Sequence, residues 1–172
     1  MPGPPHKKYR PIYGLWNMDY TILRPRQNPR LHGYDYKNGN YYFVTVCTHH
    51  KQCVFGPAGQ PNETGQMAAQ GIEAIAEHFL GITVDEYVVI PNHVHMILVF
   101  PQGKSNLSAV VGSYKSHVSK MFHVEHPKMI LWQRSFYDHV IRDEAAYLEI
   151  KRYIRENPLK WNLDEYNPQY RP

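Results

Sequence analysis

The chain has 172 residues, of which 42% are hydrophobic and 20% charged, so it fits one domain and is not a wholly disordered protein. No apolar run reaches the roughly 18 residues that span a bilayer, and the opening MPGPPHKKYR lacks the apolar core of a secretory signal. The two cysteines, Cys47 and Cys53, exclude a disulfide-dense scaffold, and their spacing matches no common zinc motif. These features predict a cytoplasmic protein with no membrane partner.

The net charge of +4 is unevenly distributed along the chain. Residues 1–60 hold eight of the 19 lysines and arginines but only two of the 15 acidic residues, and many aromatic residues lie between them. Such a segment suits single-stranded nucleic acid, because cations meet phosphates and rings stack on bases. An ordinary solvated arm has the same composition, so charge alone leaves both interpretations open.

In the first half of the chain, residues 1–33 show no periodicity, which predicts an irregular arm. The β-branched and aromatic run at 41–48 predicts a strand. Thr64 is expected to cap a helix that ends near Leu80, before Gly81. The apolar residues at helical spacing in this segment are Met67, Ile72, Ile75, Ala76 and Phe79.

Residues 84–90 and 93–100 read as two strands joined by a tight Pro91-Asn92 turn, which predicts a hairpin. The second strand is apolar on both faces apart from its histidines, so it is expected in the middle of a sheet. A helix is predicted over 106–123. Its expected buried stripe is Leu107, Val110, Val111, Tyr114, Val118, Met121 and Phe122, with Lys115 and Lys120 facing outward.

A short strand is predicted at 134–141, followed by a helix over 144–157 that Asp143 caps and Pro158 ends. Residues 159–172 are expected to be irregular. The resulting order of strands and helices is typical of an α+β fold with one antiparallel sheet backed by helices.

The strand at 93–100 begins with His93-Val94-His95. Residues i and i+2 of a strand point to the same face, so both imidazoles project together, as they must to hold one divalent metal. Two imidazoles buried without partners would be costly in this apolar strand. The alternative is a pair of hydrogen-bonded structural histidines.

A third metal ligand has to come from elsewhere, and the helix over 144–157 offers Tyr153 and Asn157, four residues apart on one face. Pattern alone favours a packing tyrosine and a helix-terminal asparagine at these positions.

Four stretches together suggest a family. They are RLHGYDY at 30–36, YFVTVCT at 42–48, VVIPNHVH at 88–95, and FYDHVIR at 136–142 followed by YIRENP at 153–158. In this order and at these spacings, the chain resembles the REP-associated tyrosine transposases, a branch of the single-tyrosine HUH transposases.

The resemblance implies a ferredoxin-like HUH fold over residues 30–161, with a basic arm at 1–29 and a tail at 162–172. It implies an enzyme that cleaves and rejoins single-stranded DNA near hairpins through a 5′-phosphotyrosine intermediate, as a monomer or homodimer associated with the nucleoid. Carried over by position, Tyr153 is the nucleophile and His93 and His95 bind Mg²⁺ or Mn²⁺. Asn157 completes the metal shell, where relatives often have glutamine.

Seven basic residues are hypothesised to contact the DNA: Arg24, Arg26, Arg30, Lys115, Lys120, Arg152 and Arg155. A solvated charge is the alternative for each lysine on a helix face. Tyr137 and Tyr147 compete as nucleophiles, but only Tyr153 has an asparagine four residues on. His139 either supports the site or is structural.

Two other functions remain open. A non-catalytic hairpin-binding protein descended from a transposase would bind DNA without cutting it. A metal-dependent hydrolase that uses the H-x-H pair and activated water would cut DNA without forming a covalent adduct.

Overall fold

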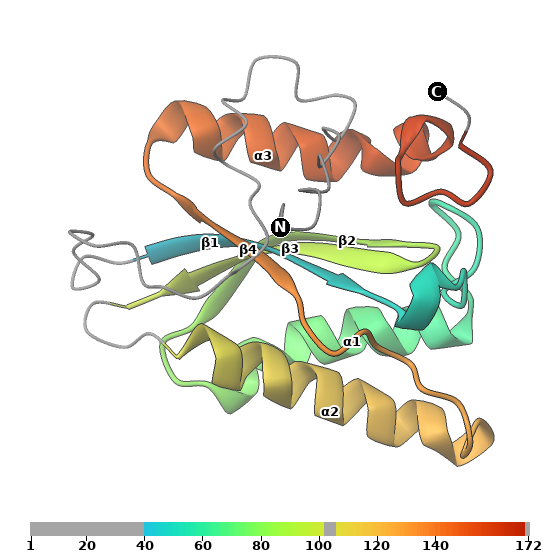
Figure 1. Cartoon of the computed structure of the whole chain (residues 1–172). Coiled ribbons are helices and arrows are strands. Elements are labelled where there is room, and N and C mark those ends of the chain that lie inside the picture. Colours follow the sequence, from blue (N-terminus) through green and yellow to red (C-terminus); the bar gives the residue numbers. More distant parts are fainter. Residues whose placement is uncertain (1–39, 102–105, 171–172) are drawn as a thin grey trace, which may run out of the picture.

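The computed structural model describes residues 40–101 and 106–170. Four strands form one antiparallel sheet in the order β2-β3-β1-β4, and helices cover both of its faces (Figure 1). The strands are β1 (Asn40–Cys47), β2 (Thr83–Ile90), β3 (His93–Phe100) and β4 (Tyr137–Ile141). This architecture confirms the predicted α+β class with an antiparallel sheet backed by helices.

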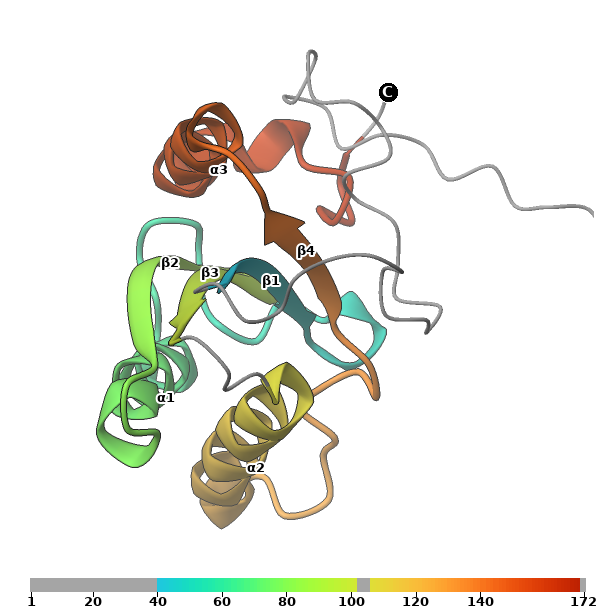
Figure 2. The same cartoon turned by 90° about the vertical axis from the view of Figure 1, so that its left-hand side faces the viewer.

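Three α-helices are divided between the two faces of the sheet. Helices α1 (Glu63–His78) and α2 (Leu107–Glu125) lie side by side on one face, and α3 (Glu144–Glu156) lies on the other (Figure 2). Two short 3₁₀ segments complete the described elements, η1 (His49–Lys51) and η2 (Asn157–Leu163). None of the helices within the described ranges is long and apolar enough to cross a bilayer.

Strand β3 lies inside the sheet, paired with β2 on one side and β1 on the other, as its apolar sequence predicts. Its alternating side chains separate two cores. Val94, Met96 and Leu98 belong to the larger core with α1 and α2, whereas Ile97 packs in a smaller core with residues of α3. Because the period of a strand is two residues, His93 and His95 lie on the same face as Ile97, toward α3.

The predicted boundaries differ from the structure in several places. Helix α1 is capped by Asn62, whose Oδ1 accepts a hydrogen bond from the Gly65 N–H at 2.9 Å, so the prediction of Thr64 as the cap is wrong. Ala76 is exposed, whereas Ala68 and Gly71 are buried. These small residues are buried because α1 and α2 approach closely, which a hydrophobic pattern does not reveal.

At the C-terminal end, Asp143 caps α3 as predicted, accepting a hydrogen bond from the Ala146 N–H at 2.8 Å. The strand β4 begins only at Tyr137, later than predicted. Pro158 ends the α-helix, but the chain continues as the 3₁₀ segment η2, so the expectation of irregular structure is wrong as far as Leu163. Proline fits there because it occupies the start of η2, where its missing N–H is not needed.

A testable consequence concerns the contact between α1 and α2. A Cβ on Gly71 would lie 2.5 Å from Val118 Cγ2, a branched and stiff side chain, whereas a Cβ on Gly112 of α2 would meet nothing within 4 Å. G71A is therefore expected to lower the free energy of unfolding by about 1–3 kcal/mol. G112A is the matched control and should raise it by about 0.5–1 kcal/mol. Urea denaturation measures both, and a G71A protein as stable as G112A would contradict this packing.

Candidate active site

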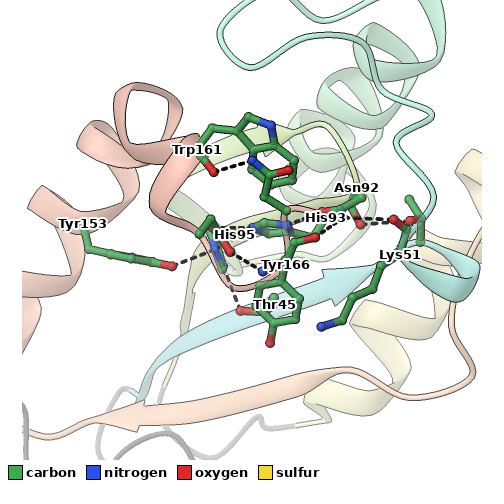
Figure 3. A network of polar contacts seen from close by, with 11 residues as sticks. Thr45, Lys51, Asn92, His93, His95, Tyr153, Trp161 and Tyr166 are labelled. Carbon is green, nitrogen blue, oxygen red and sulfur yellow. Dashed lines mark hydrogen bonds and ion pairs between the residues drawn. The ribbon is translucent and has the colours of Figure 1, made fainter. Parts of the chain in front are cut away.

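His93 and His95 are fully buried and face each other at the α3 side of the sheet (Figure 3). Their Nε2 atoms lie 3.0 Å apart, and their rings meet edge to face with centroids separated by 4.5 Å. The structure thus places the two imidazoles together, as the H-x-H spacing predicts.

The hairpin turn fixes the tautomer of His93. Its Nδ1 lies 2.8 Å from Asn92 Oδ1, and the Asn92 Nδ2 donates to the carbonyls of Lys51 and Tyr166. These two carbonyls determine the orientation of the amide, so the oxygen faces His93. Because that oxygen only accepts, His93 carries its proton on Nδ1 and presents a lone pair on Nε2.

His95 is held from the neighbouring strand. Thr45 of β1 lies directly opposite it in the register, and the Thr45 Oγ1 is 2.8 Å from His95 Nδ1. A hydroxyl both donates and accepts, so Thr45 supports either tautomer of this ring. Phe43 stacks on the same imidazole with centroids 5.2 Å apart.

Helix α3 brings Tyr153 to this pair. The Tyr153 hydroxyl lies 3.3 Å from His95 Nε2, and the side chain is only 9% exposed. Its ring is edge-on to Phe43, and Ile150 and Ile154 on the same face of α3 anchor the helix in the smaller core. The structure therefore joins the predicted nucleophile to the predicted histidines, which are 58 and 60 positions away in the sequence.

Asn157 follows one turn later and is also buried, at 3% exposed. Burial raises the pKa of both Tyr153 and Asp164, and the neighbouring Asn157 side chain opposes this rise. Its Oδ1 nevertheless has no hydrogen-bond partner in the described structure. Asp164 was not predicted: its Oδ2 lies 3.8 Å from His93 Nε2.

Two further residues at the site were also not predicted. Tyr166 packs against His93 with ring centroids 4.9 Å apart, and the Lys51 ammonium lies 4.0 Å from the centre of the Tyr166 ring. Lys51 and the preceding His50 both have positive φ, at 55° and 52°, a conformation that is uncommon for residues with a Cβ. Hydrogen bonding of the Lys51 carbonyl to Asn92 helps to hold this turn. No motif in the sequence pointed to either side chain.

Burial sets the ionisation of the site. It lowers the pKa of His95 to about 3 and that of His93 well below its ordinary value, to which His95 and Lys51 also contribute. Burial also raises the pKa of the Tyr153 phenol, with a further contribution from Asp164. The groups at the centre of the site are therefore two neutral imidazoles and a protonated phenol.

The competing side chains lie elsewhere. Tyr147 donates its hydroxyl proton to Asp85 at 2.8 Å, at the edge of the sheet. Tyr137 is opposite Thr45 in the register, and His139 is opposite Phe43, so both share the face of the pair without sitting on α3. Tyr153 hydrogen-bonds to His95, whereas Tyr147 bonds to Asp85.

Four of the basic residues proposed to contact DNA lie in the described part of the chain, on two different helices. Lys115 and Lys120 lie on α2, behind the opposite face of the sheet. Lys120 is exposed as predicted, but Lys115 is half-buried, because its ammonium donates to the carbonyls of Gln133 and Arg134; the prediction that it faces outward is wrong. Arg152 and Arg155 are exposed on α3, and Arg155 forms an ion pair with Glu86 at 2.8 Å. The other three residues, Arg24, Arg26 and Arg30, lie outside the described residues.

Comparison with known proteins defines the class. Residues 35–157 match the family model described as Transposase IS200 like, and the chain belongs to this family of transposases. The protein therefore has a transposase-like role in DNA processing. All four central side chains, from His93 to Asn157, lie inside the matched range, whereas Asp164 and Tyr166 lie beyond it.

The relatives are consistent with this assignment. The chain is 33% identical over 168 residues to an uncharacterized protein of Haemophilus influenzae, covering 83% of this chain and 93% of that relative. It is 31% identical over 77 residues to the REP-associated tyrosine transposase of Escherichia coli K12, covering 45% of this chain and 44% of that relative. A solved REP-associated tyrosine transposase, bound to a REP hairpin, shares the fold with a TM-score of 0.57 at 22% identity, over 78% of this chain and 74% of that one.

The buried histidines predict a pH dependence of stability. Burial lowers the pKa of His139 to about 4 and that of His95 to about 3, from an ordinary 6.5. The unfolded chain therefore binds more protons than the fold below about pH 6.5, and stability falls as the pH drops from there toward 4. The slope is at most about 1.4 kcal/mol per pH unit for each histidine.

Urea denaturation at a series of pH values measures this slope. H139N should make it shallower, and H117N, which replaces an exposed histidine on α2, is the control. A slope that H139N leaves unchanged would show that burial of this ring does not oppose its protonation.

Proposed function

We propose that this protein is a metal-dependent transesterase that cleaves and rejoins single-stranded DNA near hairpins through a covalent bond to Tyr153. The observation that supports it most is the tyrosine hydroxyl at 3.3 Å from one of two buried imidazoles whose Nε2 atoms converge. A structural tyrosine would not need to end at such a pair. Membership of the transposase family supports the same activity.

The residues present fit a divalent cation. Two ligand atoms that each lie about 2.1 Å from a cation, with a right angle between the two bonds, are about 3.0 Å apart. The two Nε2 atoms have this separation. The unpaired Oδ1 of Asn157 adds an oxygen acceptor from the residue four positions after Tyr153. We therefore assign His93, His95 and Asn157 as the ligands of Mg²⁺ or Mn²⁺.

In the proposed reaction, the Tyr153 oxygen attacks the phosphorus of a DNA phosphodiester and the bond from phosphorus to the 3′-oxygen breaks. The phenol gives up one proton and the leaving 3′-oxygen takes up one, so the products are a 5′-phosphotyrosyl ester and a free 3′-hydroxyl. A bound Mg²⁺ or Mn²⁺ would supply positive charge that favours the phenolate and polarises the phosphodiester. Attack by another 3′-hydroxyl reverses the step and rejoins strands without ATP.

Other residues position the reactants. Phe43 and the apolar face of α3 hold the Tyr153 ring, and Lys51 places a positive charge beside the site that suits a phosphate. Arg152 and Arg155 flank the nucleophile on the exposed side of α3 and are proposed to contact the DNA backbone. Tyr166 packs against the buried His93 and therefore borders the proposed cation site.

The decisive experiment compares the wild type with Y153F on labelled single-stranded hairpin DNAs, including both strands that flank the gene, with Mg²⁺ or Mn²⁺. A DNA-labelled protein band on a denaturing gel should require metal and disappear in Y153F. The amount of adduct should fall by about 1000-fold or more, as expected when a nucleophile is removed. Y147F is the matched control, because Tyr147 lies on the same helix but bonds to Asp85.

Other outcomes would contradict the proposal. Cleavage without an adduct, retained by Y153F, would indicate a hydrolase that uses activated water. Tight hairpin binding without cleavage, on the full set of flanking hairpins, would indicate a non-catalytic DNA-binding protein.

A second prediction concerns the support of His95. When Nε2 binds a cation, Nδ1 carries the proton and must donate it, and Thr45 is the acceptor within reach. T45V removes this acceptor and should weaken Mn²⁺ binding and cleavage by about 10–100-fold. T45S keeps the hydroxyl and should remain close to the wild type. Equal metal affinities of T45V and the wild type would show that Thr45 does not orient the ring.

A further inference from the structure

Asp164 is a buried carboxylate close to the histidine pair. It follows η2, is 5% exposed, and its Oδ1 accepts a hydrogen bond from the Tyr166 N–H at 2.7 Å. This bond orients the carboxylate within the turn at 164–166. The second oxygen, Oδ2, then lies 3.8 Å from His93 Nε2.

Hydrogen-bond acceptors of His93 and Asp164 face each other here. Asn92 holds the proton of His93 on Nδ1, so His93 Nε2 offers a lone pair to the carboxylate oxygen, which is itself an acceptor. The neighbouring Asn157 has a buried Oδ1 with no partner in the described structure. Acceptors that face each other at this distance are an arrangement that a cation stabilises.

We propose that Asp164 is a further ligand of the divalent cation held by His93, His95 and Asn157. Asn157 begins η2 and Asp164 directly follows it. This inference rests on the proposed function, because it assumes that His93 and His95 hold a metal. It goes beyond the H-x-H pair and the asparagine, since Asp164 lies after the end of the family match at residue 157.

The carboxylate needs only a small movement. As they stand, no three His, Cys, Asp or Glu side chains in the described parts of the chain are placed to hold a metal ion. However, the 3.8 Å between Oδ2 and His93 Nε2 exceeds the separation of adjacent ligands, about 3.0 Å, by less than roughly 1 Å. The proposal therefore requires the Asp164 side chain to rotate toward His93 when the cation binds.

The addition of Asp164 changes the chemistry of the site. Two neutral imidazoles and an amide carry no charge, whereas a carboxylate supplies a negative charge and a hard oxygen. Such oxygens favour Mg²⁺ and Mn²⁺. The pairing also ties the segment that carries Tyr166 to the catalytic centre, so metal binding and the packing of this segment become linked.

The test uses the full-length protein without DNA and Mn²⁺ or Co²⁺ alone as the probe. Mn²⁺ affinity is measured by electron paramagnetic resonance of the free ion, and the donor set is monitored by the visible absorption of Co²⁺. D164N keeps the size of the side chain and the acceptor for the Tyr166 N–H, but loses the charge. E165Q, at the adjacent half-buried position, controls for the loss of a nearby charge.

We expect D164N to weaken Mn²⁺ binding about tenfold or more and to change the Co²⁺ spectrum, with E165Q within about threefold of the wild type. D164E restores the carboxylate and should recover part of the affinity, which guards against a D164N protein that fails to fold. Circular dichroism checks the fold of each variant.

Three results would overturn the inference. Unchanged Mn²⁺ affinity and Co²⁺ spectrum in D164N, with both lost in H95A, would show a histidine site without Asp164. A weaker affinity with an unchanged Co²⁺ spectrum would show that the carboxylate acts only through its charge. If H95A binds as the wild type does, no metal lies at the pair, and the metal assignment of the proposed function fails as well.

Discussion

The architecture of this site depends on burying two imidazoles side by side in the middle of a sheet. A buried ring nitrogen without a partner is costly, so each of the four nitrogens needs a defined neighbour. Asn92 supplies one for His93 and Thr45 supplies one for His95, which leaves the two Nε2 atoms facing each other. The same arrangement that gives each Nδ1 a partner places the two Nε2 atoms 3.0 Å apart.

The fold supplies these neighbours through strand register and through one turn. The pairing of β1 with β3 sets Thr45 opposite His95, and a slip of one residue would move the whole set to the face covered by α1 and α2. The Asn92 amide also binds the carbonyls of Lys51 and Tyr166. The Asn92 side chain therefore contacts His93, the strained turn at Lys51 and the segment that carries Tyr166.

The sequence predicted the sheet, its central strand and the convergence of the histidines, because strand alternation and the Pro91-Asn92 turn are local signals. It also predicted Tyr153 beside them, but only through resemblance to a family, since helical spacing by itself suits a packing tyrosine. Asp164 and Lys51 had no signal in the sequence, because their positions result from a 3₁₀ turn and from a strained turn that tertiary contacts hold. Lys115 was misplaced because a carbonyl pair beyond its own helix draws its ammonium inward.

The central claim is that the two Nε2 atoms, together with Asn157, hold a divalent cation next to the Tyr153 hydroxyl. The most direct measurement is a crystal structure of the protein grown with Mn²⁺, with anomalous differences collected above and below the manganese absorption edge. The account predicts one anomalous peak within about 2.3 Å of both His93 Nε2 and His95 Nε2, at a distance typical of metal–ligand bonds. Ordered histidines with no peak between them at saturating Mn²⁺ would contradict it.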